Sequence, residues 1–359
     1  GYKGRCRGYG GLSGLNFWKW RDTMQQDEII LRKGIVHILD GELGYPVYSE
    51  QQLDITPDLN EFFTGHIFKI MSGDDMKKCY FDEESSDIYK LLKDFSEDDF
   101  IDFSKDITKR LYDIMNSNLA IPSADLAVLS FSLHSVMYLA ILKMNYKESF
   151  VHMTQAEESG NVNSIIKYRS TLPASSSKLS EAVIINLGDY TVNIIEKKYE
   201  VNGEKCNYLS ELYLNCHAAM SSKSKLAIVT KAVEQVNKKH FEEEPVKQME
   251  AKRIIKEEIE ETGAVNVEKI SEKLYGKTPD IKEEFDAKME KYHMEKAEVK
   301  PQSSATTKKF EKQFLKTDTG IEINIPMEQY QDINQVEFIS NPDGTISVMI
   351  KNINKISTR

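Results

Sequence analysis

The chain has 359 residues, of which 40% are hydrophobic, so it is long enough for about two or three domains with buried cores. Its most apolar stretch, residues 126–144, is interrupted by three serines, a histidine and a lysine, whereas a membrane helix needs roughly 20 apolar residues. The 57 acidic and 47 basic residues give a net charge of −10. These values exclude a membrane-spanning protein and argue against one that coats nucleic acid uniformly.

The first 23 residues differ in composition from the rest. They contain six glycines, both tryptophans, five basic residues and one acidic residue, without helical or strand periodicity. This composition predicts a disordered leader. It is either a basic, aromatic tail that contacts nucleic acid or translated flanking sequence before a true start at Met24. The abrupt change at Met24 favours the second interpretation, and without the leader the net charge is −14.

Residues 24–216 are predicted to form an N-terminal α+β domain with an antiparallel sheet. An apolar, β-rich run at 29–39 ends at a turn, and Thr56-Pro57 is typical of a helix start. Further helices are predicted at 85–93 and at 96–115, the second with Ser96 and Asp99 as a capping box. Strands are predicted at 125–133, 136–145 and 150–155 as antiparallel neighbours, and at 182–187 and 191–199 as a hairpin.

The remaining chain is predicted to contain a helical region at 217–294, a linker at 295–309 and a small β-rich module at 310–359. The helices are expected at 225–241, 246–261, 267–275 and 280–294, and the strands at 310–316, 320–325, 336–340 and 345–351. The helix at 267–275 follows a longer one, which superficially resembles a helix-turn-helix. Its only bases are Lys269, Lys273 and the nearby Lys277, too few for a recognition helix.

Two charged segments of opposite sign stand out. Residues 82–113 carry eleven acidic and five basic residues, and such a surface repels DNA. Residues 221–240 carry one acid, Glu234, and five lysines on an amphipathic helix: Lys223, Lys225, Lys231, Lys238 and Lys239. These lysines are the candidate contacts to double-stranded DNA, which they would bind through phosphates and without strong sequence specificity, and a solvated surface is the alternative.

Motifs for catalysis are sparse. No phosphate-binding loop, dinucleotide-binding glycine motif, serine nucleophile elbow or zinc motif is present. One arrangement is similar to metal-dependent nucleases: Asp189, Glu196 and Lys198 on the predicted hairpin, with Glu181 before it. Because this ExK spacing is common in a chain rich in lysine and glutamate and Asp189 suits a turn, we predict no enzyme activity, no metal site and no cofactor.

Several motifs occur together in one order. They are FDEES at 81–85, DFIDFS at 99–104 and TKRL at 108–111, followed by ISEKLYG at 270–276 and GIEINI at 320–325. In this order they resemble the bacterial thirty-seven-kilodalton nucleoid-associated proteins, the NdpA or YejK-like family, over nearly everything but the leader. The resemblance implies a cytoplasmic, nucleoid-located protein that associates with DNA or with DNA-bound machinery, including type II topoisomerases, and it implies no catalytic residues.

The leading prediction is therefore a non-enzymatic nucleoid-associated protein that binds DNA weakly through the lysines at 223–239. A protein-binding adaptor of DNA machinery that uses the acidic helices is the alternative, and a metal-dependent nuclease is third. The four scattered cysteines, with no CxxC pair, favour the reducing cytoplasm. Whether the chain forms a homo-oligomer stays open.

Overall fold

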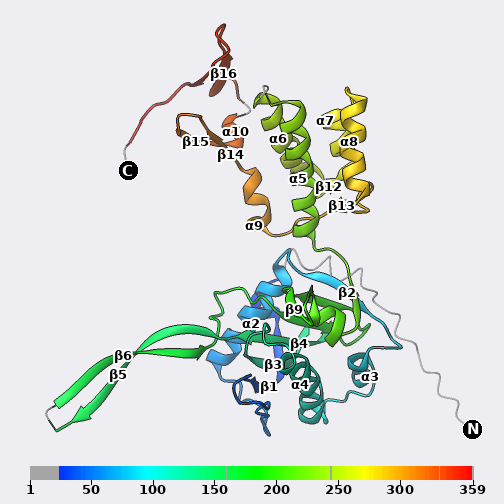
Figure 1. Cartoon of the computed structure of the whole chain (residues 1–359), viewed down its shortest axis with the longest axis vertical. Helices are drawn as coiled ribbons and strands as arrows, with labels where there is room; N and C mark the ends of the chain where they lie inside the picture. Colours follow the sequence, from blue (N-terminus) through cyan, green and yellow to red (C-terminus); the bar gives the residue numbers. More distant parts are fainter. Residues whose placement is uncertain (1–23, 159, 243–244, 331, 358–359) are drawn as a thin grey trace, which may run out of the picture. The chain divides into compact units, whose positions relative to one another are not determined.

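The computed structural model describes residues 24–158, 160–242, 245–330 and 332–357. The predicted leader, residues 1–23, lies outside the described residues. The chain divides into two compact units, residues 1–220 and 221–359 (Figure 1).

An antiparallel sheet of seven strands forms the centre of the first unit, in the order β1-β3-β4-β7-β8-β2-β11. The antiparallel α+β fold predicted from the sequence is therefore confirmed. The strands of this sheet are β1 (Ile30–Leu39), β2 (Lys77–Phe81), β3 (Ala124–Leu133), β4 (Val136–Asn145), β7 (Ala182–Asn186), β8 (Val192–Ile195) and β11 (Cys216–Ala218).

Helices cover both faces of this sheet, because its central strands are apolar on both sides. Leu126 and Val128 of β3 pack in one core with α4 (Phe100–Asn116) and α3 (Asp87–Lys93). The intervening Ala127 and Leu129 pack in the other core with α2 (Pro57–Ser72). Successive residues of a strand point to opposite faces, so the near-continuous apolar run of β3 is explained by this three-layer arrangement.

The helix starts follow local capping chemistry. The Thr56 side chain accepts a hydrogen bond from the backbone N–H of Leu59 at 3.4 Å, and Pro57 occupies the first turn, which confirms the predicted start of α2. The start of α4 was predicted too early. The Ser96 hydroxyl donates a hydrogen bond to the Asp99 carboxylate at 3.0 Å and does not cap a helix. Helix α4 begins at Phe100.

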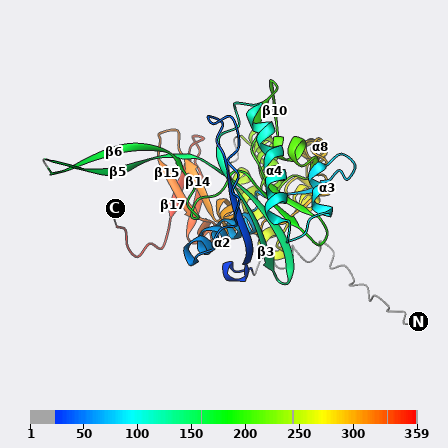
Figure 2. The ribbon, with the colours of Figure 1, turned by 90° about the horizontal axis from the view of Figure 1, so that it is seen from below.

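The predicted strand at 150–155 is part of a longer one that lies outside the main sheet. β5 (Lys147–Glu157) pairs only with β6 (Gly160–Thr171), and the two form a hairpin that projects from the first unit (Figures 1 and 2). The prediction that this strand is a sheet neighbour of 136–145 is wrong, since β4 pairs with β3 and β7. A polar or charged residue occurs on both faces of β5, so neither face could be buried against the core at low cost.

Short elements complete the first unit. They are the 3₁₀ turn η1 (Gln26–Glu28), the π-helical turn η2 (Leu209–Tyr213) and the two-stranded pair β9 (Tyr199–Val201) and β10 (Glu204–Cys206).

The second unit begins with four helices around one apolar core: α5 (Ser222–His240), α6 (Pro245–Thr262), α7 (Val267–Tyr275) and α8 (Pro279–Glu290). β12 (Val265–Asn266) pairs with β13 (Glu298–Val299) beside them. Part of the segment 295–309 is thus built into the unit, and Val299 and the following Phe310 are buried in its core.

Small elements follow toward the C-terminus. They are α9 (Ser304–Thr307), η3 (Lys308–Phe310), the hairpin of β14 (Lys312–Lys316) and β15 (Glu322–Pro326), α10 (Met327–Tyr330), and the hairpin of β16 (Val336–Ser340) and β17 (Ile346–Ile350). The backbone N–H of Gly344 donates to the Asn341 carbonyl at 3.0 Å, which closes the turn between the last two strands. Gly344 has φ +84, a conformation that glycine adopts without steric cost.

Candidate nucleic-acid interface

Helix α5 carries the five lysines predicted to contact DNA. It begins after Ser221, whose side chain accepts a hydrogen bond from the Ser224 N–H at 3.1 Å. Leu226, Val229 and Val236 are buried in the core of the second unit. The amphipathic pattern therefore fixes the rotation of the helix and turns its polar side outward.

The five lysines do not form one cluster. Lys223, Lys231, Lys238 and Lys239 are exposed, and Lys225 is half-buried. Lys231 and Lys238 are seven residues apart and lie on the same side of α5, about 10 Å from one another along the helix axis.

Lys239 is engaged within the protein. Its Nζ lies 2.8 Å from Glu284 Oε2 of α8, and His240 Nε2 lies 2.8 Å from the same oxygen. Hydrogen bonds from Lys239 and then from His240 lower the pKa of the Glu284 carboxyl to about 2. Lys239 therefore faces α8, although it is adjacent in sequence to Lys238.

Lys238 instead lines a cavity of about 730 Å³ within the second unit. Three further lysines line it from other elements: Lys252 of α6, Lys309 of η3 and Lys316 of β14. Sequence reasoning missed these three, since they are far from α5 along the chain. The recurrence of lysines at 308, 309, 312 and 316 is a signal that could have indicated Lys309 and Lys316, but it does not extend to Lys252.

Two of the amines in this cavity are partly buried. Lys309 Nζ donates to Thr230 Oγ1 at 3.3 Å, and Lys252 Nζ donates to the Lys312 carbonyl at 2.8 Å. Burial lowers the pKa of both amines, and the nearby Glu234 carboxylate opposes that change. Burial without a carboxylate contact destabilises the charged form of an amine, so a bound anion would stabilise it.

The lysines also differ in whether they form an ion pair with a carboxylate. In the part of the chain that the structure describes, Lys231, Lys238, Lys252 and Lys309 form no ion pair with a carboxylate, whereas Lys316 lies 3.0 Å from Glu322 Oε1. We call Lys231, Lys238, Lys252 and Lys309 the unpaired lysine set. Among the described residues, Glu234 and Glu242 line the same cavity as Lys238, Lys252 and Lys309 without forming an ion pair with them.

The acidic segment at 82–113 forms an exposed surface in the first unit. All eleven of its acidic residues are exposed. Its bases are engaged locally: Arg110 Nη1 lies 2.6 Å from Asp87, Lys109 Nζ lies 2.9 Å from Asp113, and Lys105 pairs with Glu50. Most of the negative charge on this surface therefore has no cation beside it among the described residues.

The nuclease-like residues are engaged in other contacts. Asp189 Oδ1 accepts a hydrogen bond from the Thr191 N–H at 2.9 Å, which stabilises the turn between β7 and β8, as predicted. Glu196 is turned inward, where its carboxylate accepts from Lys77 Nζ at 3.1 Å and from the Ser210 hydroxyl at 2.9 Å. Lys198 is exposed.

Glu181 is part of a buried network. Its side chain is fully buried and pairs with Lys143 Nζ at 3.2 Å. Asn145 Nδ2, Tyr199 Oη and Tyr208 Oη also donate to its two oxygens. Among the described residues, no three acidic, histidine or cysteine side chains are placed to hold a metal ion together.

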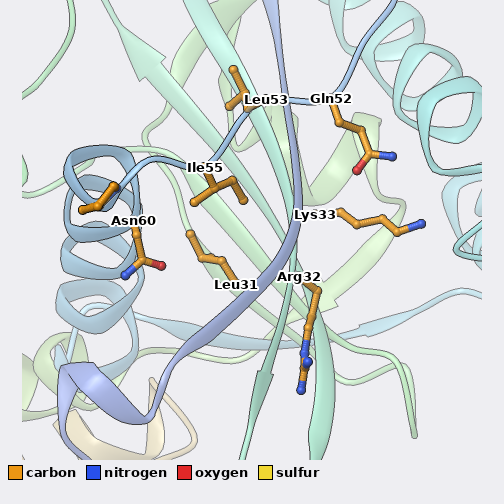
Figure 3. Close-up of a pocket in the computed structure, with 8 residues that line it drawn as sticks. Leu31, Arg32, Lys33, Gln52, Leu53, Ile55 and Asn60 are labelled. Atoms are coloured by element: carbon orange, nitrogen blue, oxygen red, sulfur yellow. The ribbon is translucent and has the colours of Figure 1, made fainter.

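A second cavity, of about 600 Å³, lies beside the edge strand β1 of the first unit (Figure 3). Leu31 and Ile55 lie close together on one side of β1, and Lys33 projects from the other side of this strand. Arg32 donates to Ser132 Oγ at 3.2 Å, and Lys33 donates to the Glu97 carbonyl, so both cations have neutral partners, as Lys252 and Lys309 do. It carries fewer positive charges than the cavity of the second unit.

The lysines of α7 are also occupied. Lys273 Nζ lies 2.7 Å and Lys269 Nζ 3.6 Å from the Glu258 carboxylate, whose side chain is 1% exposed. Residues 276–278 join α7 directly to α8, whereas β12 separates α6 from α7. The superficial helix-turn-helix of α6 and α7 is thus interrupted by a short strand, and the sequence-based rejection of a recognition helix stays a prediction.

The family profile described as nucleoid-associated protein YejK matches residues 35–356. The chain belongs to this family. The nucleoid-associated protein family was the one suspected from the motifs at 81–111 and 270–325, and the match extends over parts of both units, including all five lysines of α5. No curated protein matches the chain. Among the described residues, no helix is both long and apolar enough to span a membrane.

Proposed function

We propose that this nucleoid-associated protein binds double-stranded DNA weakly and without strong sequence specificity through its second unit. The contacts would be the α5 lysines at 223, 225, 231 and 238, joined by Lys252 and Lys309 around the cavity. Lys239 would contribute least, because Glu284 already neutralises it.

One observation carries this proposal. Three elements bring Lys238, Lys252 and Lys309 to one cavity, and none of these amines has a carboxylate partner among the described residues. Lysines of this kind bind phosphate oxygens regardless of base sequence and release counterions, so affinity falls steeply with salt. No base-reading side chain is needed in this account.

A salt titration of DNA binding tests the proposal. The full chain is titrated with a duplex of random sequence at several salt concentrations, and Lys231→Glu combined with Lys238→Glu is compared with the original protein. We expect the double variant to lose more than about tenfold in affinity and to show a shallower salt dependence. Unchanged affinity and slope would show that DNA does not contact this face.

A second function is supported by the acidic surface at 82–113. Its exposed carboxylates repel phosphates but attract a basic protein surface. We propose, as the alternative, an adaptor that binds a protein of the DNA machinery, such as a type II topoisomerase. Neutralising Asp98, Asp102 and Asp106 to asparagine would then abolish retention of partners that survive nuclease treatment of a lysate, and would leave DNA affinity intact.

The proposed role is non-enzymatic and located in the cytoplasm at the nucleoid. The nuclease-like carboxylates support this, because Asp189 holds a turn and Glu181 and Glu196 are buried in other contacts. Incubation of a labelled duplex with protein and Mg²⁺ tests it. Cleavage that Glu196→Ala abolishes would overturn the non-enzymatic role.

A further inference from the structure

The hairpin of β5 and β6 projects from the first unit as a separate two-stranded ribbon (Figures 1 and 2). We call it the arm. Isolated two-stranded ribbons are marginally stable in water, because they bury little apolar surface. The arm nevertheless keeps a regular register from Ser149↔Tyr168 to Glu157↔Gly160.

One face of the arm carries an apolar stripe, with at least one apolar side chain on each of three successive rungs, and the other face carries Phe150 and Ile165, 72% and 77% exposed. Successive residues alternate between faces, so the register places Val151 opposite Ile166, Met153 opposite Ser164, and Gln155 opposite Val162 on the same side. Val151 and Ile166 are 39% and 37% exposed, and Val162 is 43% exposed. Met153 lies at the middle rung of this stripe. Apolar stripes of this length on a projecting ribbon are typical of interaction surfaces.

The charges of the arm are divided along its length. Its base carries Lys147, Lys167 and Arg169 with one acid, Glu148, which pairs with Lys167. Its tip carries Glu157 and Glu158 and no base. The arm as a whole is neutral, with a positive base and a negative tip.

This distribution points to a particular partner. An acidic tip repels DNA phosphates, which argues against insertion of the arm into a DNA groove. A second arm laid antiparallel across the first would place each acidic tip against the basic base of the other. In this arrangement a two-fold axis would pass near Met153, so that Met153 of one arm would lie beside Met153 of the other. The two apolar stripes would then cover each other.

We propose that the arm is a self-association surface on which a second copy of this chain docks, arm against arm and antiparallel. Eleven residues at about 3.3 Å each give a ribbon about 36 Å long and roughly 10 Å wide, so two faces bury about 700 Å² in total. Stable interfaces bury roughly 1,200 Å² or more. The dimer is therefore expected to be weak and to dissociate on dilution and, because of the tip-to-base charges, at high salt.

Sedimentation velocity of the full chain over a range of concentrations tests this proposal. We expect a monomer–dimer equilibrium whose dissociation constant rises with salt. Met153→Glu places two carboxylates together at the two-fold axis and is expected to weaken the dimer about tenfold or more. The matched control is Asn163→Glu, which adds the same charge on the opposite face and keeps an acceptor for the Thr154 hydroxyl.

A charge-swap experiment tests the antiparallel arrangement. One variant combines Glu157→Lys with Glu158→Lys, and a second combines Lys147→Glu with Arg169→Glu. Each alone brings like charges together and is expected to remain monomeric, whereas an equimolar mixture is expected to form a heterodimer. Three results would overturn the proposal. They are monomers at every concentration, equal effects of Met153→Glu and Asn163→Glu, and no heterodimer in the mixture.

Discussion

Lys143 Nζ lies 3.2 Å from Glu181 Oε2, and the two side chains are 2% and 0% exposed in the first unit. Burial lowers the pKa of the Lys143 amine, and the Glu181 carboxylate opposes this. Three further donors bind the same carboxylate: Asn145 and Tyr199 donate to Oε2, and Tyr208 donates to Oε1. The pair joins β4 to the residue that precedes β7.

Removal of one partner of this pair should destabilise the first unit. Lys143→Met leaves the Glu181 carboxylate buried without a cation, which is expected to lower the free energy of unfolding by about 3–5 kcal/mol. Urea denaturation measures this change in the free energy of unfolding. Lys198→Met, on an exposed lysine, is the control and should stay within about 0.5 kcal/mol. Combining Lys143→Met with Glu181→Gln should recover part of the lost stability. If Lys143→Met alone cost no more stability than the Lys198→Met control, the role given to this pair would be refuted.

Acid should destabilise the protein through His37. This ring accepts a hydrogen bond from the Ser49 N–H at Nδ1 and lies 2.9 Å from Ser104 Oγ at Nε2, and burial, followed by the charge of Lys105, lowers its pKa from 6.5 to about 4. The unfolded chain therefore binds more protons between these two pH values. The stability that neutral His37 provides is fully present above pH 6.5 and is lost as the pH falls through about 4.

The pH dependence can be measured by denaturation of the original protein and of His37→Asn, which keeps a donor and an acceptor. We expect a smaller loss of stability between pH 6.5 and pH 4 in the variant. An NMR titration of the His37 ring provides a direct check. A midpoint near 6.5 in the folded protein would contradict this account.

The lysines of α7 are expected to matter for stability and not for DNA. Lys269→Gln with Lys273→Gln would leave the buried Glu258 carboxylate without its cations, at a cost of about 1–3 kcal/mol in the unfolding of the second unit. DNA affinity should change little, because both amines are occupied. A large loss of affinity in a folded double variant would place α7 in contact with DNA.

Much of the fold can be predicted because local patterns agree with it. The strands predicted at 136–145 and 336–340 have the same bounds in β4 and β16, since apolar runs there are bounded by turn residues. β6 was not predicted. Its residues, such as Asn163, Lys167 and Arg169, are exposed on both faces, so no core imposes an alternating pattern on them.

The candidate site could be predicted only in part. The density of lysines on α5 indicated Lys238 correctly as an exposed cation, but the other three lysines of its cavity come from α6, η3 and β14, which only tertiary packing brings there. Sequence reasoning also could not distinguish Lys238 from Lys239. That difference arises because Glu284 of α8 faces one of the two positions and not the other.

DNA binding through the cavity of the second unit is tested by comparing Lys238→Gln with Lys239→Gln, because both variants remove one positive charge from adjacent positions. The measurement is the slope of the logarithm of the DNA binding constant against the logarithm of the salt concentration. Lys238→Gln is expected to reduce the magnitude of this slope by about 1 and to weaken binding, and Lys239→Gln to change it by less than half as much. Equal slopes for the two variants, or slopes identical to that of the original protein, would contradict DNA binding through this cavity.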